Sequence, residues 1–352
     1  MPPAGPGSLG DAAILAGLAR ALTDRGAAAV TAPPHAPPPG VDAVIVAGAD
    51  IMDGFYGPGP VEERVDLLIA AHRRGLPTAV AGASLNRAPH PAALAALRRL
   101  PAATALRFRD APSARRARAL LGRPVELVAD PAFLLAAEPP APRLAGWVAG
   151  HRSAGRTVIG LNANGLLARL QPGLDSVSAH AALAAALSRR LGAAAVVLIP
   201  HDLRPGSDDL ALARGITGSL PGEVDVAVCD DPSAARAKGL CALLDLVVTG
   251  RLHLAIAATG AGTPVMCMDY QDKVAALGPA PHRFAPAELR RPARLAERIT
   301  REVGRPRAAA PAIPGLEALA RANVGPWPEP PESAVPREPL RDGERRVGTR
   351  NG

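Results

Sequence analysis

Short apolar runs rich in Val, Ile, Leu and Ala alternate along the chain with longer stretches whose apolar positions recur at helical spacing. The short runs end at Gly, Pro, Asp or Thr, which is typical of strands buried on both faces. Strands are predicted over 27–31, 42–47, 78–81, 105–109, 125–128, 157–161, 195–200, 225–229, 244–248 and 264–268. Helices are predicted over 12–25, 61–74, 91–99, 112–121, 178–191, 208–219, 232–240, 252–258, 286–302 and 315–323. This alternation predicts an α/β fold.

A proline-rich stretch, Glu138-Pro-Pro-Ala-Pro, separates two such α/β sets. We therefore expect two Rossmann-like, doubly wound parallel-sheet domains facing a cleft. The expected boundaries are 1–140 for the first domain, 141–155 for the linker and 156–325 for the second domain. After 326 the sequence is rich in Pro, Glu and Arg with no apolar period, which predicts a disordered tail over 326–352.

The first domain is expected to lack its first strand. Leu9-Gly10-Asp11 reads as a turn that opens a helix, and such a turn normally follows a strand. Residues 1–8 are dominated by Pro and Gly and are unsuited to a strand. Either translation starts upstream of this methionine or the strand has been lost.

The segment Thr249-Gly-Arg-Leu-His253 contains several residues that could bind a ligand or take part in catalysis. It joins an apolar strand to a helix, so Arg251 and His253 are predicted at a helix N-terminus, where free N–H groups and the helix dipole favour an anion. Arg251 supplies a fork for a carboxylate or phosphate, and His253 can carry a proton near neutral pH. Taken singly, Thr249 could be an N-cap, Arg251 a surface charge and His253 a satisfied polar group. Their clustering favours a binding site.

Other polar residues also fall at predicted strand ends, which face the cleft in such folds. They are Gly10-Asp11, Asp50, Arg109-Asp110, Asp130 and His201-Asp202. Asp110 and Asp130 are explained equally well as helix N-caps. Asp11 directly follows Gly10 at a helix start and is expected to point into the cleft.

Composition narrows the function classes. The 352 residues are 48% apolar but only 2% aromatic, and the net charge of +8 is carried almost wholly by arginine. Because the arginines are scattered and not interleaved with aromatic residues, we expect no nucleic-acid partner, and the charge suits anionic small substrates or a nearby membrane surface. Cys229, Cys241 and Cys267 lack metal-ligand spacing and indicate buried thiols in a reducing compartment. With no signal peptide or spanning segment visible, we expect a cytoplasmic protein, in peripheral contact with the inner face of the membrane at most.

Taken together, these segments resemble the polysaccharide pyruvyl transferase family. The matching pieces are Gly7-Ser-Leu-Gly-Asp-Ala-Ala-Ile14, Arg109-Asp-Ala-Pro-Ser113, Asp130-Pro-Ala-Phe-Leu134, Pro200-His-Asp202, Asp245 to His253, Ala257, Gly262-Thr-Pro264 and Tyr270-Gln-Asp-Lys273. The resemblance implies a GT-B-like pair of domains and transfer of a pyruvyl group from phosphoenolpyruvate to a sugar, forming a pyruvate ketal. The acceptor would be a polysaccharide or its nucleotide- or lipid-linked precursor. The oligomeric state is left open.

Site residues follow from this resemblance and from the chemistry. The expected donor-binding residues are Gly10, Arg109, Ser113, Arg251, Leu252, His253 and Lys273, and the expected acceptor-binding residues are Asp50, His201 and Asp202. A carboxylate and a phosphate call for arginine forks and a helix N-terminus. Ketal formation also needs proton transfers, which suit His253 and a carboxylate such as Asp11. The candidate catalytic residues are therefore His253 and Asp11, together with Arg251. The turn Ala47-Gly-Ala-Asp50 has fewer glycines than the family pattern, so the acceptor side is expected to differ.

No metal or cofactor is expected, because no His, Asp and Glu residues have ligand spacing. Two other functions stay open at this point. One is a nucleotide-sugar glycosyltransferase of the same architecture. The other is a non-catalytic sugar- or nucleotide-binding protein.

Overall fold

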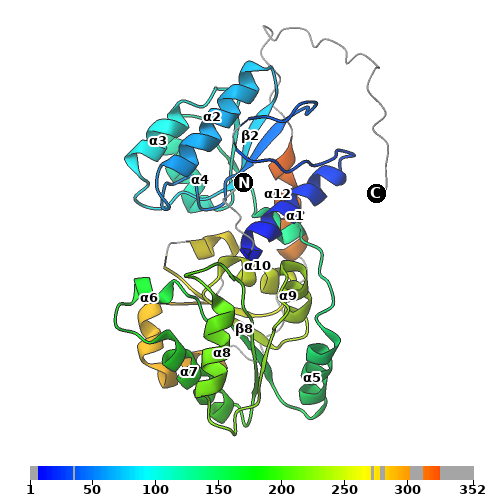
Figure 1. Cartoon of the computed structure of the whole chain (residues 1–352), viewed down its shortest axis with the longest axis vertical. Coiled ribbons are helices and arrows are strands. Elements are labelled where there is room, and N and C mark those ends of the chain that lie inside the picture. The colour runs from blue at the N-terminus through cyan, green and yellow to red at the C-terminus, as the bar shows by residue number, and fades with distance from the viewer. Residues whose placement is uncertain (1–6, 35, 271–272, 278–281, 302–311, 326–352) are drawn as a thin grey trace, which may run out of the picture.

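Two parallel sheets, each with helices on both faces, make up the two halves of the molecule (Figure 1). The computed structural model describes residues 7–34, 36–270, 273–277, 282–301 and 312–325. The predicted tail over 326–352 lies outside the described residues. Strands and helices alternate along nearly the whole chain, as the sequence predicts.

The N-terminal sheet has the strand order β1-β2-β3-β4. Its strands are β1 Val44–Ala47, β2 Thr78–Ala83, β3 Ala105–Phe108 and β4 Glu126–Leu127. Helices α2 Gly59–Arg73, α3 Pro91–Arg98 and α4 Ala111–Leu121 cover one face, and α1 Leu9–Thr23 and α12 Ala312–Arg321 lie against the other. Side chains alternate along β1 accordingly: Val44 and Val46 pack under α2–α4, and Ala47 packs towards α1.

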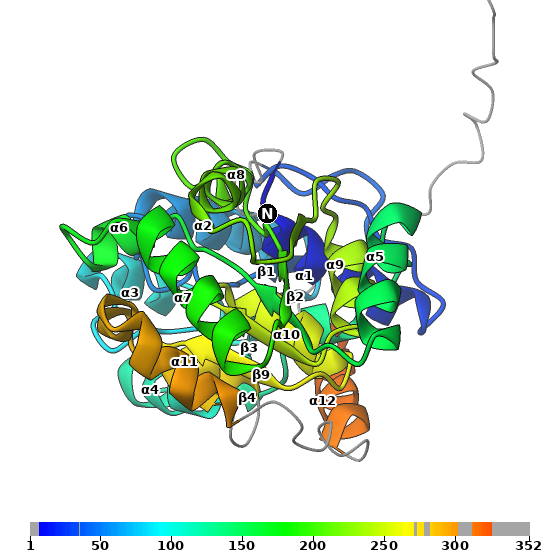
Figure 2. The ribbon, with the colours of Figure 1, turned by 90° about the horizontal axis from the view of Figure 1, so that it is seen from below.

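The C-terminal sheet has the order β10-β9-β8-β5-β6-β7. Its strands are β5 Val158–Leu161, β6 Ala195–Leu198, β7 Val226–Val228, β8 Leu246–Thr249, β9 Val265–Met268 and β10 His282–Phe284. Helices α7 Ser176–Arg190, α8 Asp209–Ser219 and α11 Pro292–Thr300 cover one face, and α5 Pro142–Ser153, α9 Ala234–Cys241 and α10 Leu252–Gly260 the other (Figure 2). The strand order reverses between β5 and β8, and in open α/β sheets ligands bind outside the strand ends at such a switch point.

The domains are joined by close helix packing. Helix α1 packs against the 3₁₀ helix η1 Pro131–Leu134 and also against α9 and α10 of the other domain. At Gly17 the approach is so close that an added Cβ would lie 1.9 Å from the Pro131 carbonyl oxygen. Helix α12 returns to the N-terminal domain, and the Asn323 amide that follows it donates to the Ala129 carbonyl at 2.8 Å. One hydrophobic core therefore runs through both domains.

Several elements differ from the sequence prediction. Residues 27–31 form an exposed coil and not a strand, with Val30 72% exposed, because this segment pairs with no strand of the described sheet. Residues 142–153, expected within the linker, form helix α5, which begins at Pro142. The predicted helix over 286–302 is divided into the 3₁₀ helix η3 Pro286–Arg290 and α11, because Pro292 starts a new helix.

The sequence did not predict the short elements α6 Leu167–Leu170, β10 and η2 Lys273–Leu277. The 3₁₀ helix η4 Ala322–Val324 directly follows α12. Among the described residues, no helix is long and apolar enough to cross a membrane.

Candidate active site

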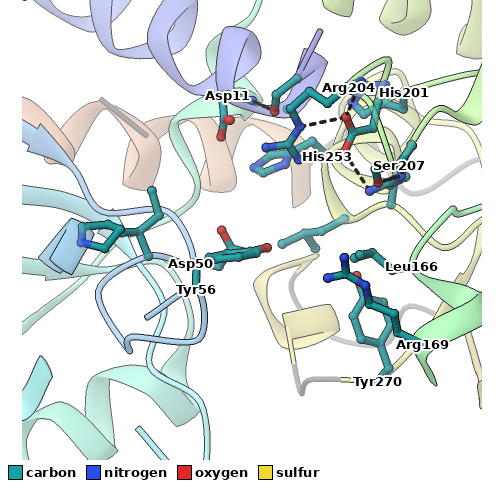
Figure 3. Close-up of a pocket in the computed structure, with 18 of the residues that line it drawn as sticks. Asp11, Asp50, Tyr56, Leu166, Arg169, His201, Arg204, Ser207, His253 and Tyr270 are labelled. Atoms are coloured by element: carbon teal, nitrogen blue, oxygen red, sulfur yellow. Dashed lines mark hydrogen bonds and ion pairs between the residues drawn. The ribbon is translucent and has the colours of Figure 1, made fainter. Parts of the chain in front are cut away.

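A cavity of about 430 Å³ lies between the two domains (Figure 3). Its size falls within the range usual for small-molecule sites, about 300–1,000 Å³. Both domains contribute to its walls. The lining residues are Ser8, Gly10, Asp11, Asp50, Ile51, Tyr56, Pro60, Arg109, Leu166, Arg169, His201, Asp202, Arg204, Pro205, Gly206, Ser207, Arg251, Leu252, His253 and Tyr270.

His253 lies where the two domains meet. Its Nε2 is 3.5 Å from Asp130 Oδ2 and 3.4 Å from Arg109 Nη1, both of which belong to the N-terminal domain. Arg109 in turn donates to the same Asp130 oxygen at 2.6 Å. Burial alone would raise the pKa of Asp130, but Arg109 and His253 outweigh it and hold that pKa far below its ordinary value. Asp130 is thus an anion that orients His253.

Asp130 also acts as the N-cap that the sequence allowed. Its other carboxylate oxygen accepts from the Ala132 N–H at 2.9 Å at the start of η1. Ser84 accepts from Arg109 Nε at 2.7 Å and donates to Asp110, which caps α4. The Asp130 carboxylate therefore caps η1 and also holds Arg109, and the Asp110 carboxylate caps α4 and also accepts from Ser84.

Gly10 and Asp11 lie opposite His253 in the first turn of α1. A Cβ at position 10 would lie 2.4 Å from His253 Nδ1, so the glycine leaves room for the imidazole. Ser8 caps α1. Burial, opposed by the Ser8 hydrogen bond and by His253, raises the pKa of Asp11 above its ordinary value. The expectation that Asp11 faces the cleft agrees with its place in the cavity lining.

Arg251 is held by residues of its own domain. Its Nε and Nη2 form a fork on Asp209 at 3.1 and 2.6 Å, Nη1 donates to Asp202 at 3.1 Å, and Nη2 also donates to the Ser207 hydroxyl at 2.9 Å. The Arg251 side chain is only 11% exposed. All three guanidinium nitrogens are therefore engaged within the protein, although Arg251 lines the cavity.

Two of the predicted acceptor-side residues surround this fork. Asp202 accepts a second fork from Arg204, at 2.9 and 2.7 Å. His201 is 4% exposed, and neither of its ring nitrogens has a hydrogen-bond partner in the described part of the chain. Burial, followed by the nearby His253 and Arg251, lowers the pKa of His201 to about 3. His201 is therefore neutral.

The remaining predicted residues divide between the cavity and its surroundings. Asp50 lines the cavity and accepts from the Tyr56 hydroxyl at 3.0 Å, and Leu252 lies at the start of α10 in the same lining. Ser113 lies behind the wall, where its hydroxyl accepts from the Leu85 N–H at 2.8 Å. The side chain of Lys273 lies outside the described part of the structure.

Sequence reasoning missed five residues of this site. Asp209, which holds Arg251, follows the α8 N-cap Asp208, and an extra carboxylate beside a cap was the available signal. Tyr56 and Tyr270 are the only two tyrosines of the chain, and both line the cavity. Arg169 and Arg204 carried no signal, because they lie in loops between the predicted elements.

The described residues contain no group of three or more His, Cys, Asp or Glu side chains that could hold a metal ion. The cavity is lined by arginines, carboxylates, two histidines and the N-terminus of α10. Such groups bind anions and move protons.

Among solved structures, the chain is similar to a putative UDP-N-acetylglucosamine 2-epimerase from Listeria monocytogenes, with 11% identity, 90% of this chain and 79% of that chain covered, and a TM-score of 0.53. A second similar structure is MnaA of S. aureus in complex with UDP, with 13% identity, 92% and 76% covered, and a TM-score of 0.48. The first of these similarities concerns the fold, a GT-B arrangement of two parallel-sheet domains.

No curated protein matches the chain. A family model does, and it indicates a transferase. The match spans residues 9–272, which include α1, the Arg109–Asp130 pair and the Arg251–His253 segment, and the chain therefore belongs to the polysaccharide pyruvyl transferase family.

Proposed function

We propose that this protein transfers the pyruvyl group of phosphoenolpyruvate to two hydroxyls of a sugar, forming a cyclic pyruvate ketal and releasing phosphate. The observation that carries the proposal is the position of His253. It lies at the N-terminus of α10, where the Arg251 side chain forms no capping bond, it is held by Asp130, and it lines the same cavity as Asp11. Family membership supports the same reaction.

Proton transfer is the first requirement of this chemistry. A proton must reach the methylene carbon of the donor, which leaves positive character on the carbon that bears the phosphate. Asp11 suits this step because it lines the cavity and burial raises the pKa of its carboxyl above the ordinary value. His253 suits removal of the proton from the attacking hydroxyl, since Asp130 can hold Nε2–H and leave Nδ1, above Gly10, as the base.

The atoms balance without a further reactant. One C–H bond forms at the methylene carbon, two C–O bonds form to the sugar oxygens, and the C–O bond to the phosphate breaks. Of the two hydroxyl protons, one is accounted for in the new methyl group and the other in the departing hydrogen phosphate. The enol oxygen of the donor therefore leaves with the phosphate.

The donor's two anionic groups need positive partners, and the cavity offers them. The Arg251 side chain makes no hydrogen bond that caps α10, so the start of this helix can offer its N–H groups to an anion. Arg109 Nη2 has no partner in the described part of the chain, and Arg109 lines the cavity. We assign donor binding to these two features.

Arg251 takes a different role in this proposal. Its nitrogens are engaged by Asp202, Asp209 and Ser207, so it fixes the strand end from which Leu252 and His253 project. We therefore assign Arg251 as a positioning residue, with donor contact through the α10 backbone that it supports.

The test is acceptor-dependent release of phosphate from phosphoenolpyruvate. Purified protein is supplied with a panel of free, nucleotide-linked and lipid-linked sugars, and the sugar product is followed by mass spectrometry. The proposal predicts phosphate release only with an acceptor, and its loss in His253→Asn. Release of UDP from a nucleotide sugar would instead identify a glycosyltransferase, and ligand binding with no transfer by the wild-type protein would indicate a binding protein.

A further inference from the structure

Both tyrosines of the chain line the interdomain cavity, although they come from different domains. Tyr56 lies in the loop between β1 and α2, and Tyr270 follows β9. Aromatic residues make up only 2% of the sequence, so their meeting in one cavity is not a result of abundance. A tyrosine presents an apolar ring and a polar hydroxyl, which matches a sugar with its apolar C–H face and its hydroxyl rim.

The Tyr56 ring is held in place by its neighbours. The Tyr56 hydroxyl donates to Asp50 at 3.0 Å, and the Phe55 ring packs edge-on against it with 5.1 Å between the centroids. Burial raises the pKa of Tyr270 to about 12, so its hydroxyl keeps its proton at neutral pH and can donate a hydrogen bond. Figure 3 shows Tyr56 and Asp50 on the wall from the N-terminal domain, and Tyr270 on the opposite wall.

Arg169 is the fourth arginine in the lining of the cavity. The other cavity arginines are paired: Arg109 with Asp130, Arg204 with Asp202 and Arg251 with Asp209. The side chain of Arg169 forms no hydrogen bond or ion pair within the described part of the chain, and it lies beside Tyr270 in Figure 3. Its guanidinium is therefore available to an anion on a ligand.

The backbone that carries Arg169 is anchored. Asn164 just before α6 donates to the Gly250 carbonyl at 2.7 Å, and the Gly165 N–H donates to Asp209 at 3.3 Å. Leu167, the first residue of α6, is fully buried. The backbone before Arg169 is thus bonded to Asp209, the residue that also holds Arg251. These contacts fix the position of the Arg169 backbone relative to His253.

We propose that Tyr56, Tyr270 and Arg169 form the acceptor subsite, and that the acceptor sugar carries an anionic group that Arg169 binds. Calling the ligand an acceptor rests on the proposed function. The donor's carboxylate and phosphate are assigned to Arg109 and the α10 N-terminus, so the charge at Arg169 is left for the acceptor. A phosphate ester and a carboxylate share the required chemistry.

The test is a binding measurement that needs no donor and no turnover. Methyl glycosides of glucose, galactose and mannose are compared by calorimetry with the corresponding sugar 1-phosphates, and with glucuronate and galacturonate as the carboxylate arm. We expect at least one 1-phosphate or uronate to bind the wild-type protein about tenfold more tightly than its neutral counterpart. Arg169→Ala removes that difference, and Arg169→Lys retains part of it. Arg214→Ala, an exposed arginine on α8 away from the cavity, is the control and leaves it unchanged.

The ring contacts are tested separately with Tyr56→Leu, since the Tyr56 residue is 52% exposed and its replacement does not threaten folding. We expect the affinities for neutral and charged probes to fall by the same factor. The inference is overturned if no anionic probe binds the wild-type protein, or if Arg169→Ala leaves the preference for the anion intact. Failure of phosphate release from phosphoenolpyruvate, with Arg169-dependent binding intact, would contradict the proposed function alone.

Discussion

His253 packs directly over Gly10, so closely that a Cβ at position 10 would lie 2.4 Å from the imidazole Nδ1. Gly10→Ala should therefore push His253 away from Asp130. Because the displaced ring can move into the cavity, the melting temperature should change little while turnover falls by roughly a hundredfold. Gly146→Ala is the matched control, since an added Cβ in that helix meets nothing within 4 Å. Equal turnover in the two variants would contradict the role given to this contact.

We predict that the Asp11 carboxylate lowers the stability of the folded protein at neutral pH although it is needed for turnover. Burial raises its pKa above 3.8, so the ionised carboxylate is less favourable in the folded protein than in the unfolded chain. This penalty is absent below pH 3.8 and is complete once the pH exceeds the raised pKa. Asp11→Asn should therefore melt at a higher temperature than wild type at pH 7, with the gap narrowing towards pH 4.

The same substitution should lower turnover by roughly a hundredfold, because the amide cannot deliver the proton. In the wild-type protein, kcat should fall as the pH rises through the raised pKa of Asp11. Thermal melts and a pH–rate profile check both parts. A variant with wild-type turnover would remove Asp11 from the mechanism.

Arg251 should behave as a structural partner of Asp209. Arg251→Met leaves the buried Asp209 without its fork, which should lower the free energy of unfolding by about 3–5 kcal/mol. Adding Asp209→Asn should restore part of that loss, since no unpaired charge then stays buried. Denaturant unfolding of both single variants and the double variant gives the coupling energy. The alternative, direct contact with the donor, predicts that Arg251→Lys raises the KM for phosphoenolpyruvate about tenfold with an unchanged melting curve.

Much of the fold could be predicted from the sequence, because most of the strands, such as β2, β5, β6 and β8, are buried apolar runs. The strand β10, His282–Phe284, is polar at two of its three residues and was not predicted. The segment 27–31 shows where this reasoning fails. Its Ala-Ala-Ala-Val-Thr run suits a strand, but a strand also needs a neighbour to pair its backbone, and the described sheet gives it none.

The site was predictable only in part. Predicted strand ends located His201, Asp202 and His253, and a predicted helix start located Asp11; all four line the cavity. Sequence alone gave no means of knowing that Asp130 would reach His253, because that contact depends on how two domains pack. Nor could it show that Arg251 is held by Asp209, since many helices begin with such an aspartate for capping alone.

The central claim, pyruvyl transfer with departure of the enol oxygen, is tested most directly with phosphoenolpyruvate labelled with ¹⁸O at the bridging oxygen. The reaction is run with an acceptor sugar that supports phosphate release, and both products are weighed by mass spectrometry. Because both ketal oxygens come from the sugar, we predict that the label appears in the released phosphate and that the sugar gains an unlabelled pyruvyl group. Label in free pyruvate would show hydrolysis at phosphorus, and a phosphorylated sugar would show phosphoryl transfer. Either result would contradict the account.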